Sequence, residues 1–524
     1  DHKSQWHIDC KNTAALELTY EVYAFDNSVR TAWLDTQRGF FNGTSLCLRV
    51  HGQEDVVHGL TLKAHKGSTW SVATGLQSVK VNKQGFGEYL ASNYDELVDC
   101  PFEMGNFWRG EFTACGIPHE FVIAGAMASF DGARLLADTQ KICETEIKFW
   151  HEKKPAAHAP YKRYVFMLNA VEDGYGGLEH RDSTVLLCKR DDLPYPGQTI
   201  TTHSGYEDFL GLCSHEYFHS WMVKRIKPKA FDPYSLGQKN HTTLLWLFEG
   251  FTSYYDDLQL LRSGRIDFSR YLKRIEKTWN MVLRGPGRHK QSLSESSFDA
   301  WTKYYQMDEN TPNAVVSYYA KGSLLALALD IKIRAHTKQK QSLDDVMRHL
   351  WEMYQLTETG MAEDDFDRAI EFVIGPSFAA TWVQMKSDYV DGVKDIPLDS
   401  LLTSVGVKVS LKETLPTENA ETAKQLLGIR TTAQQGWIKL THVLDSGLAQ
   451  QAGLAAGDYI SSINSERVTP GRLDHLLTQL AQKLSRGQTV KALAYRHEQE
   501  FAATFQARSD LTSGQPKQYS ITVK

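Results

Sequence analysis

Two histidines and a glutamate in one short segment have the types and the spacing needed to hydrolyse a peptide bond with a metal ion. The segment contains His215-Glu216-x-x-His219, and no proline or glycine lies between Leu212 and Lys227. This composition predicts a helix, on which residues four apart share a face, so both imidazoles could bind one ion. Neutral imidazoles suit zinc, and Glu216 would lie beside a water on the fourth coordination position. A carboxylate base beside such a water is the arrangement that hydrolyses peptide bonds.

The alternative for this pattern is coincidence. With 19 histidines in 524 residues, a chain of this composition contains such a pattern by chance with a probability of roughly one in ten. Two histidines on an amphipathic helix can also be ordinary polar-face residues. The pattern therefore needs support from other parts of the chain.

A third ligand is predicted at Glu249, in a second helix that begins near Thr242. Glu249 lies in the run Leu244–Tyr255, among Leu, Trp and Phe, where an unpaired carboxylate would be costly to bury. Two helices joined by a loop of this length can pack side by side and bring Glu249 to the histidine face. Three protein ligands and one open position are what a catalytic zinc site requires. The alternative, a surface glutamate, fits poorly with such apolar neighbours.

Two further segments could border this site. Gly176 and Gly177 leave the backbone uncovered, so that a ligand chain could lie against it, although a plain hairpin turn explains two glycines as well. Ser317-Tyr318-Tyr319-Ala320-Lys321-Gly322 opens a helix, and a tyrosine near zinc can donate its hydroxyl to an oxyanion. From spacing alone, a core position is favoured for this tyrosine.

The composition limits the class of protein. A chain of 524 residues is too long for one core and indicates two to four domains. A formal charge of -5 argues against a general nucleic-acid binder, and the absence of an 18-residue apolar run predicts no transmembrane helix. Seven scattered cysteines without a C-x-x-C pair indicate reduced thiols and hence the cytoplasm, with one bridge, such as Cys100 to Cys115, and a periplasmic location as alternatives.

Periodicity predicts a β-rich N-terminal region followed by helices and a last small unit. Alternating segments predict strands, and longer apolar segments predict buried strands or helices. The predicted strands are 16–23, 45–50, 69–73, 119–123, 164–168, 183–188, 436–440 and 489–495. The predicted helices are 134–151, 206–226, one from near 242, 268–283, 318–333, 343–354 and 473–484.

Together these motifs resemble those of the M61 peptidases, often called the glycyl aminopeptidase family, within the gluzincin zinc peptidases. The resemblance rests on H-E-Y-F-H-S-W at His215, W-L-F-E-G-F-T-S-Y-Y at Trp246, Y-Y-A-K-G at Tyr318 and G-G-L-E-H at Gly176. The stretch 20–43 also looks like the family's N-terminal domain. The resemblance covers nearly the whole chain and implies that residue 1 lies inside that β domain.

The resemblance implies a role for each site residue. It implies one zinc ion bound by His215, His219 and Glu249, with Glu216 as general base and Tyr319, rather than Tyr318, as oxyanion donor. Gly-Gly-Leu-Glu is also similar to the Gly-x-Met-Glu-Asn loop of the related M1 aminopeptidases. By that similarity, Gly176 and Gly177 would lie along the substrate and Glu179 would hold its α-amino group. His180 and Leu178 replace the usual Asn and Met, which makes this part of the resemblance looser.

The C-terminal unit looks like a PDZ domain, which M61 enzymes commonly carry. Leu427, Gly428 and Ile429 could form its carboxylate loop, in which backbone amides hold a peptide C-terminus and the peptide adds a strand. A packing module without a ligand is an equal alternative.

We therefore expect a multidomain α+β protein. The expected parts are a β-rich domain at 1–125, truncated at its start, a thermolysin-like α/β plus helical zinc peptidase domain at 126–395, a linker at 396–419, a PDZ domain at 420–510 and a C-terminal tail at 511–524. The expected function is a zinc aminopeptidase (EC 3.4.11) that removes small N-terminal residues, Gly or Ala, from peptides with a free N-terminus.

Two rival functions stay open. One is a zinc endopeptidase whose PDZ domain recruits substrates, in which Glu179 would have no role. The other is a non-catalytic peptide-binding protein on a peptidase scaffold, against which Glu216 and Tyr319 argue because a binder needs neither. The expected partners are peptide substrates and peptide C-termini at the PDZ domain, without nucleic acid or membrane. The oligomeric state is left open.

Overall fold

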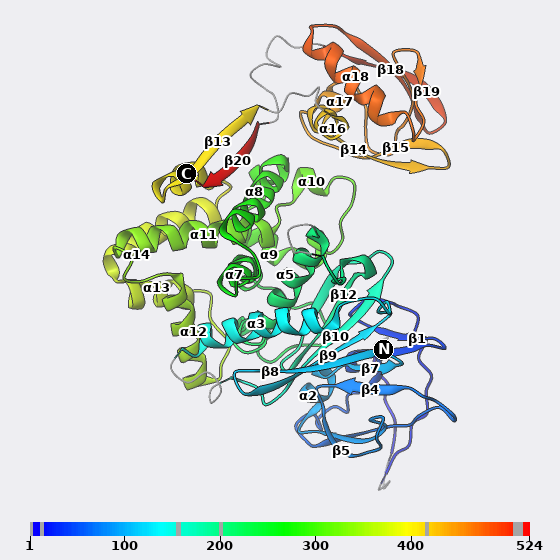
Figure 1. Cartoon of the computed structure of the whole chain (residues 1–524), viewed down its shortest axis with the longest axis vertical. Helices are drawn as coiled ribbons and strands as arrows, with labels where there is room; N and C mark the ends of the chain where they lie inside the picture. Colours follow the sequence, from blue (N-terminus) through cyan, green and yellow to red (C-terminus); the bar gives the residue numbers. More distant parts are fainter. Residues whose placement is uncertain are drawn as a thin grey trace. The chain divides into compact units, whose positions relative to one another are not determined.

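Figure 1 shows the computed structural model of the chain. The chain forms two compact units. The structure describes residues 4–10, 15–152, 159–198, 203–413, 419–506 and 517–523. The first unit consists of Asp1–Asn240, Tyr255–Asp267 and Arg348–Ala362, and the second of His241–Tyr254, Phe268–Met347 and Glu363–Lys524.

The N-terminal part of the first unit is built from short strands, as the sequence predicts. A four-stranded sheet has the order β1-β2-β7-β4, and a three-stranded sheet has the order β3-β6-β5. The elements are β1 (Ala32–Leu34), β2 (Arg38–Phe41), α1 (Gly43–Leu46), β3 (His58–Leu62), β4 (Ser71–Thr74), β5 (Gln77–Val81), β6 (Gly87–Ala91), α2 (Tyr94–Asp99) and β7 (Phe102–Gly105). Phe41 and Phe102 stack within their shared core.

Two predicted strands in this region are wrong. Residues 16–23 form no strand, and the side chains of Leu16, Leu18 and Tyr20 are exposed. Alternation of apolar and polar residues favours a strand, but a β-ladder also needs a partner strand. Residues 45–50 include the end of α1 and then irregular chain, where the Tyr94 hydroxyl donates to the carbonyl of Cys47.

A five-stranded mixed sheet follows, and it carries the residues of interest. Its order is β11-β12-β10-β9-β8, with β9, β10 and β12 parallel and the two edge strands antiparallel to their neighbours. The elements are β8 (Trp108–Ala114), β9 (Ile117–Ala124), α3 (Gly132–Trp150), β10 (Tyr164–Val171), β11 (Gly176–Glu179), β12 (Ser183–Lys189) and α5 (Ser204–Phe218). β10 is buried over almost its whole length, as expected for a strand with a continuous apolar sequence.

Helix α5 contacts both β11 and β12, and α3 contacts α5 and β8. The helix that carries the His-Glu-x-x-His motif therefore lies beside the edge strand that carries the Gly-Gly-Leu-Glu segment. The free edge of β11 also leaves backbone groups available to an added peptide strand.

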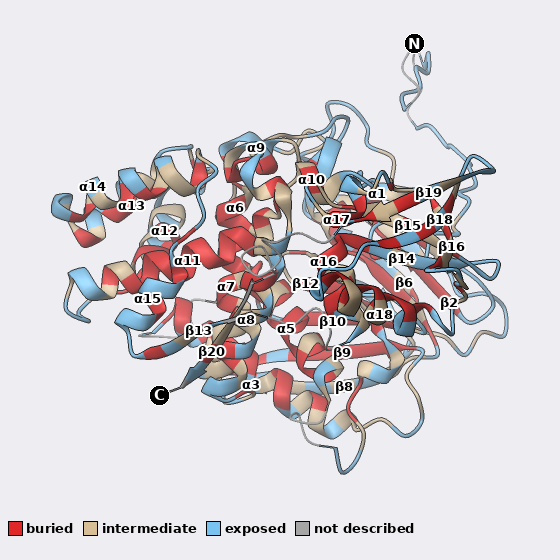
Figure 2. Cartoon of the chain, turned by 90° about the horizontal axis from the view of Figure 1, so that it is seen from above, coloured by how far each residue is buried: buried red, intermediate tan, exposed pale blue. Residues whose placement is uncertain are grey.

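The second unit begins with helices around one buried helix, α11 (Tyr318–His336). Figure 2 shows α11 mostly in the colour of buried residues. The other helices are α6 (Leu245–Phe248), α8 (Phe268–Arg284), η4 (Pro286–His289), α9 (Leu293–Phe298), η5 (Ala300–Tyr304), α10 (Thr311–Ala314), α13 (Asp365–Ile374), α14 (Pro376–Met385), η6 (Lys386–Val390) and α15 (Leu398–Ser404). Helices α7 (Gly250–Arg262) and α12 (Leu343–Thr357) each have residues in both units.

One helical stretch, Thr311–His336, is long and apolar enough to cross a membrane by length and composition. Charged residues interrupt its apolar run, so the sequence predicts no membrane-spanning helix here. The protein buries 72% of this apolar window, which is typical of a core helix.

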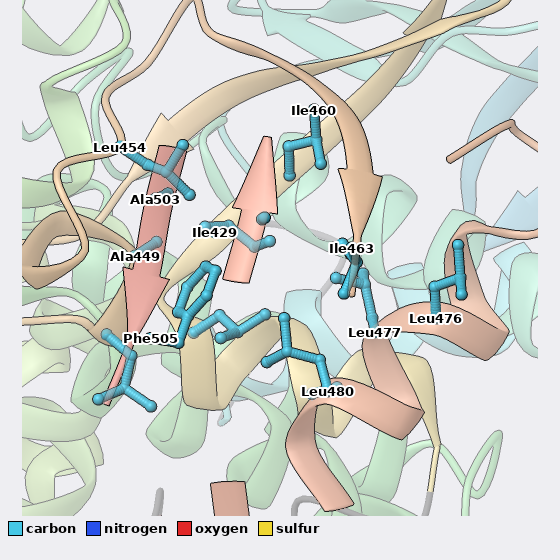
Figure 3. Close-up of a cluster of buried hydrophobic side chains, with 14 of the residues drawn as sticks. Ile429, Ala449, Leu454, Ile460, Ile463, Leu476, Leu477, Leu480, Ala503 and Phe505 are labelled. Atoms are coloured by element: carbon cyan, nitrogen blue, oxygen red, sulfur yellow. The ribbon is translucent and has the colours of Figure 1, made fainter. Parts of the chain in front are cut away.

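The C-terminal part of the second unit is a sheet with helices. Its strands have the order β14-β15-β16-β18-β19, and β17 pairs with β16. The elements are α16 (Ala420–Leu427), β14 (Ile429–Gln434), β15 (Trp437–Val443), α17 (Leu448–Gln451), β16 (Tyr459–Ile463), β17 (Glu466–Arg467), α18 (Leu473–Ser485), β18 (Val490–Arg496) and β19 (Gln499–Phe505). Figure 3 shows the apolar core, in which Ile429 and Phe505 lie with Leu477 and Leu480 of α18.

The predicted linker and tail contain paired strands. β13 (Val407–Glu413) pairs antiparallel with β20 (Lys517–Val523) over their full lengths. The predicted linker also contains helix α15, and residues 414–418, 511–516 and 524 lie outside the described residues.

Candidate active site

The motif helix α5 ends earlier than predicted. It stops at Phe218, and His219 is its C-cap, whereas composition predicts a helix to residue 226. No helix-breaking residue lies at this end of the helix. Tertiary contacts set the end instead. The Arg225 guanidinium donates to the carbonyls of Ser220, Arg181 and Pro160, and this bonding requires the chain to turn back after the helix.

The two histidine rings are each held through Nδ1. Asp256 of α7 accepts from His215 Nδ1 at 2.9 Å, and the Met222 carbonyl accepts from His219 Nδ1 at 2.6 Å. Both partners only accept, so both Nδ1 atoms carry the proton, and in neutral rings Nε2 is the atom with the lone pair. The two Nε2 atoms lie 3.1 Å apart. Two lone pairs at this distance repel each other unless a cation lies between them.

This geometry fits zinc. Two nitrogens at about 2.0–2.1 Å from one tetrahedral ion lie about 3.4 Å apart, close to the observed separation. The described residues that could hold one metal ion include the group His215, His219 and Glu249, whose ligand atoms lie within 4.8 Å of one another. Two imidazoles and one carboxylate are a donor set that zinc accepts.

Asp256 is a functional residue that sequence reasoning missed. Orientation of a metal-binding histidine by a carboxylate is common, and loss of such a partner typically costs about 10- to 100-fold in metal affinity or activity. The available signal was spacing: Asp256 lies two helical turns after Glu249, on the same helix face.

We expect Asp256→Asn to lower zinc affinity about 10- to 100-fold, because the amide oxygen is a weaker acceptor for His215 Nδ1. A chelator competition titration would measure this. Asp257→Asn, which removes the neighbouring charge on the same helix, is the control. Equal zinc affinity in the wild type and in Asp256→Asn would contradict the role.

Strand β11 places a second carboxylate beside the motif. Ligand atoms of Glu179, Glu216 and His219 lie within 4.8 Å of one another. Gly177 is required here by space, because a Cβ atom at this position would lie 2.1 Å from Glu216 Oε1. The strand that carries Glu179 thus lies directly against the predicted general base.

Glu179 has charged and aromatic neighbours. The Lys224 ammonium lies 2.7 Å from Asp99 and 5.9 Å from the centre of the Tyr234 ring. Burial opposes the charge of Lys224, but Asp99, and after it Tyr234 and Glu179, raise its pKa. Lys224 is therefore a cation next to Glu179.

Tyr319 lies beside Glu249 in the second unit. Gly250 and Gly322 allow α7 and α11 to pack closely, since a Cβ on Gly250 would lie 2.6 Å from Gly322 Cα. Burial and then the negative charge of Glu249 raise the pKa of Tyr319, so its hydroxyl stays protonated and able to donate. Tyr318 is fully buried, whereas Tyr319 is half-buried, which agrees with the choice of Tyr319 as the donor.

The predicted carboxylate loop does not form an open amide cradle. Leu427 lies inside α16, and Gly428 is the left-handed C-cap of that helix. The Gly428 amide donates to the carbonyls of Lys424 and Gln425, and Ile429 already belongs to β14. The prediction came from the resemblance to a PDZ domain, and a glycine after leucines also commonly ends a helix.

Comparisons with known proteins agree with the motifs. The model of the M61 glycyl aminopeptidase family matches residues 208–325, and the model of the peptidase M61 N-terminal domain matches residues 1–106. A crystal structure of an aminopeptidase N family protein from Idiomarina loihiensis is 38% identical, with 96% of this chain and 83% of that chain covered and a TM-score of 0.86. An M1 zinc metallopeptidase from Deinococcus radiodurans is 13% identical, with 72% of this chain and 75% of that chain covered and a TM-score of 0.46. A comparison with curated proteins gives no match.

These findings define the class of the protein, which is a zinc metallopeptidase of the aminopeptidase kind. The chain belongs to the M61 glycyl aminopeptidase family.

Proposed function

We propose that this protein removes N-terminal residues from peptides with one zinc ion held by His215, His219 and Glu249. The observation that carries the proposal is the pair of Nε2 atoms 3.1 Å apart, each fixed through Nδ1 to an acceptor. The thermolysin-like peptidase domain at 126–395 is part of the same proposal. A bound zinc ion would lower the pKa of a water molecule and polarise the scissile carbonyl.

The chain's own residues would perform the proton transfers. Glu216 accepts the proton of the attacking water and returns it to the leaving amine. Tyr319 donates its hydroxyl to the developing oxyanion, since its raised pKa keeps it protonated. Gly177 leaves room for the Glu216 side chain against strand β11, because a Cβ atom there would lie 2.1 Å from Glu216 Oε1.

Glu179 would bind the α-ammonium group of the substrate. Its ligand atom lies within 4.8 Å of those of Glu216 and His219, about one residue's length from the bond to be cut. Lys224 lies near Glu179 but is itself paired with Asp99. A preference for small first residues, Gly or Ala, comes from the family and is part of the proposal.

The experiment that tests the proposal compares a free and an N-acetylated alanyl peptide. We expect acetylation to reduce kcat/KM by at least about 100-fold, because it removes the charged α-ammonium group that Glu179 would bind. Glu179→Gln should remove most of this discrimination. The control is the variant Glu371→Gln, which changes an exposed glutamate of α13. Equal turnover of the two peptides by the wild type would favour the endopeptidase instead.

We also propose that residues 420–510 form a PDZ-like unit in which the backbone amides of Leu427–Ile429 do not hold a peptide C-terminus. The use of the Gly428 amide as a helix cap supports this choice. Helix α16 also contacts α18 and contributes Ala423, Leu426 and Leu427 to the core.

A further inference from the structure

A cavity of about 650 Å³ lies within the second unit, between its helices and its C-terminal sheet. Its walls come from α8, η4, η5, α10 and the start of α11 on one side, and from α16, β14 and β15 on the other. This volume is within the range of peptide and small-molecule sites. None of the roles proposed above uses it.

The cavity combines apolar walls with an excess of positive charge. Val315, Ile429 and Leu444 are among its apolar residues. Four lining residues are Arg or Lys, whereas two are acidic: these are Arg284, Arg288, Lys424 and Arg430 against Asp308 and Glu421.

Two of the four cations have partners and two do not. Arg288 pairs with Asp395, and Lys424 pairs with Asp474. Arg284 and Arg430 have no acidic partner among the residues that the structure describes, and one comes from each side of the cavity. Two arginines across an apolar cavity are suited to a carboxylate, which accepts from both.

The cavity adjoins the proposed oxyanion donor. Tyr304 is one of its lining residues, and its ring lies 5.7 Å from that of Tyr319. The Tyr304 hydroxyl contacts Ser317 Oγ, which caps the helix that carries Tyr319. Burial raises the pKa of Tyr304, and the Glu249 charge adds to this effect, so Tyr304 lies near both Glu249 and Tyr319.

The two sides of the cavity are joined by two hydrogen bonds of Asn313 and by one exposed ion pair. Asn313 of α10 donates to the Val443 carbonyl at 3.0 Å and accepts from the Asp445 amide at 2.9 Å. Lys290 pairs with Asp445 at 2.5 Å. Because Asn313 is buried, these bonds fix β15 against the helices and hold the cavity open in one shape.

We propose that this cavity binds the C-terminal part of the peptide substrate, with the substrate's α-carboxylate between Arg284 and Arg430. This inference rests on the proposed aminopeptidase function and adds the substrate class. The enzyme acts best on short peptides whose free C-terminus reaches the two arginines from the side of the cavity next to Tyr319. The apolar walls take the last side chain of the peptide.

The test compares peptides that differ only at the C-terminus. Alanyl tripeptides, tetrapeptides and pentapeptides that end in leucine are used as free acids and as C-terminal amides. For at least one length we expect KM to be about 10- to 100-fold lower for the acid than for the amide, with kcat changed little. The Arg284→Ala/Arg430→Ala variant should lose this ratio, and the Arg284→Lys/Arg430→Lys variant should keep part of it.

Two controls separate this inference from the proposed function. Arg486→Ala removes an exposed arginine of the same C-terminal unit, outside the cavity, and should keep the wild-type ratio. Alanine p-nitroanilide has no carboxylate, so the double alanine variant should cleave it as the wild type does. Equal KM values for acid and amide at every length, or an unchanged ratio in the double alanine variant, would overturn the inference. Failure of the wild type to cleave the anilide would instead count against the aminopeptidase itself.

Discussion

Glu216→Gln is expected to lose at least about 10²- to 10⁴-fold in kcat while it keeps a full zinc content. General bases contribute rate factors of this size. Glutamine has nearly the same shape as glutamate, so it fits against Gly177, where the wild-type side chain already fills the available space. It cannot accept the proton of the attacking water, however. Because Glu216 is not among the three proposed zinc ligands, the metal should stay bound.

Turnover of an alanyl peptide and zinc content by elemental analysis measure the two parts of this expectation. Glu371→Gln is the matched control, since it makes the same change at an exposed position of α13. Turnover within a few-fold of the wild type would exclude Glu216 as the base. Loss of zinc from Glu216→Gln would show that this residue is a ligand.

Glu249→Ala is expected to lose the metal itself. Removal of one of three protein ligands should cost more than the about 10- to 100-fold loss that is typical of an outer partner. Activity should fall with the metal, and zinc should no longer stabilise the fold. Ligand binding to the native state stabilises by about 2.7 kcal/mol at a concentration 100 times Kd. We therefore expect zinc to raise the Tm of the wild type and to leave that of Glu249→Ala unchanged.

Glu371→Ala serves as the control, with a zinc response equal to that of the wild type. A Glu249→Ala protein that binds stoichiometric zinc would remove Glu249 from the ligand set. The zinc ion would then have to be bound by His215 and His219 without the Glu249 carboxylate.

The central part of the site could be predicted because it depends on local geometry. His215 and His219 are four residues apart, and one helical turn brings them together whatever the rest of the fold does. Helices with long apolar patterns were also predicted well. Residues 134–151 and 318–333 correspond to α3 and α11, with differences of a few residues at their ends.

What could not be predicted depends on tertiary packing. The end of α5 at Phe218 is set by the bonds of Arg225 to distant carbonyls, and the His215–Asp256 pair exists only because α7 packs beside α5. The segment 16–23 has a strand pattern but no partner strand. Gly428 follows leucines in a way that suits either a binding loop or a helix cap, and in the structure it is the C-cap of α16.

The zinc site of the whole protein is tested most directly by X-ray absorption at the zinc edge, together with zinc content per chain. We expect one zinc per chain, with nitrogen and oxygen neighbours at about 2.0–2.2 Å and two of them showing the outer scattering of imidazole rings. Sulfur among the neighbours, a single imidazole, or no zinc retained after loading would contradict the assignment of His215, His219 and Glu249.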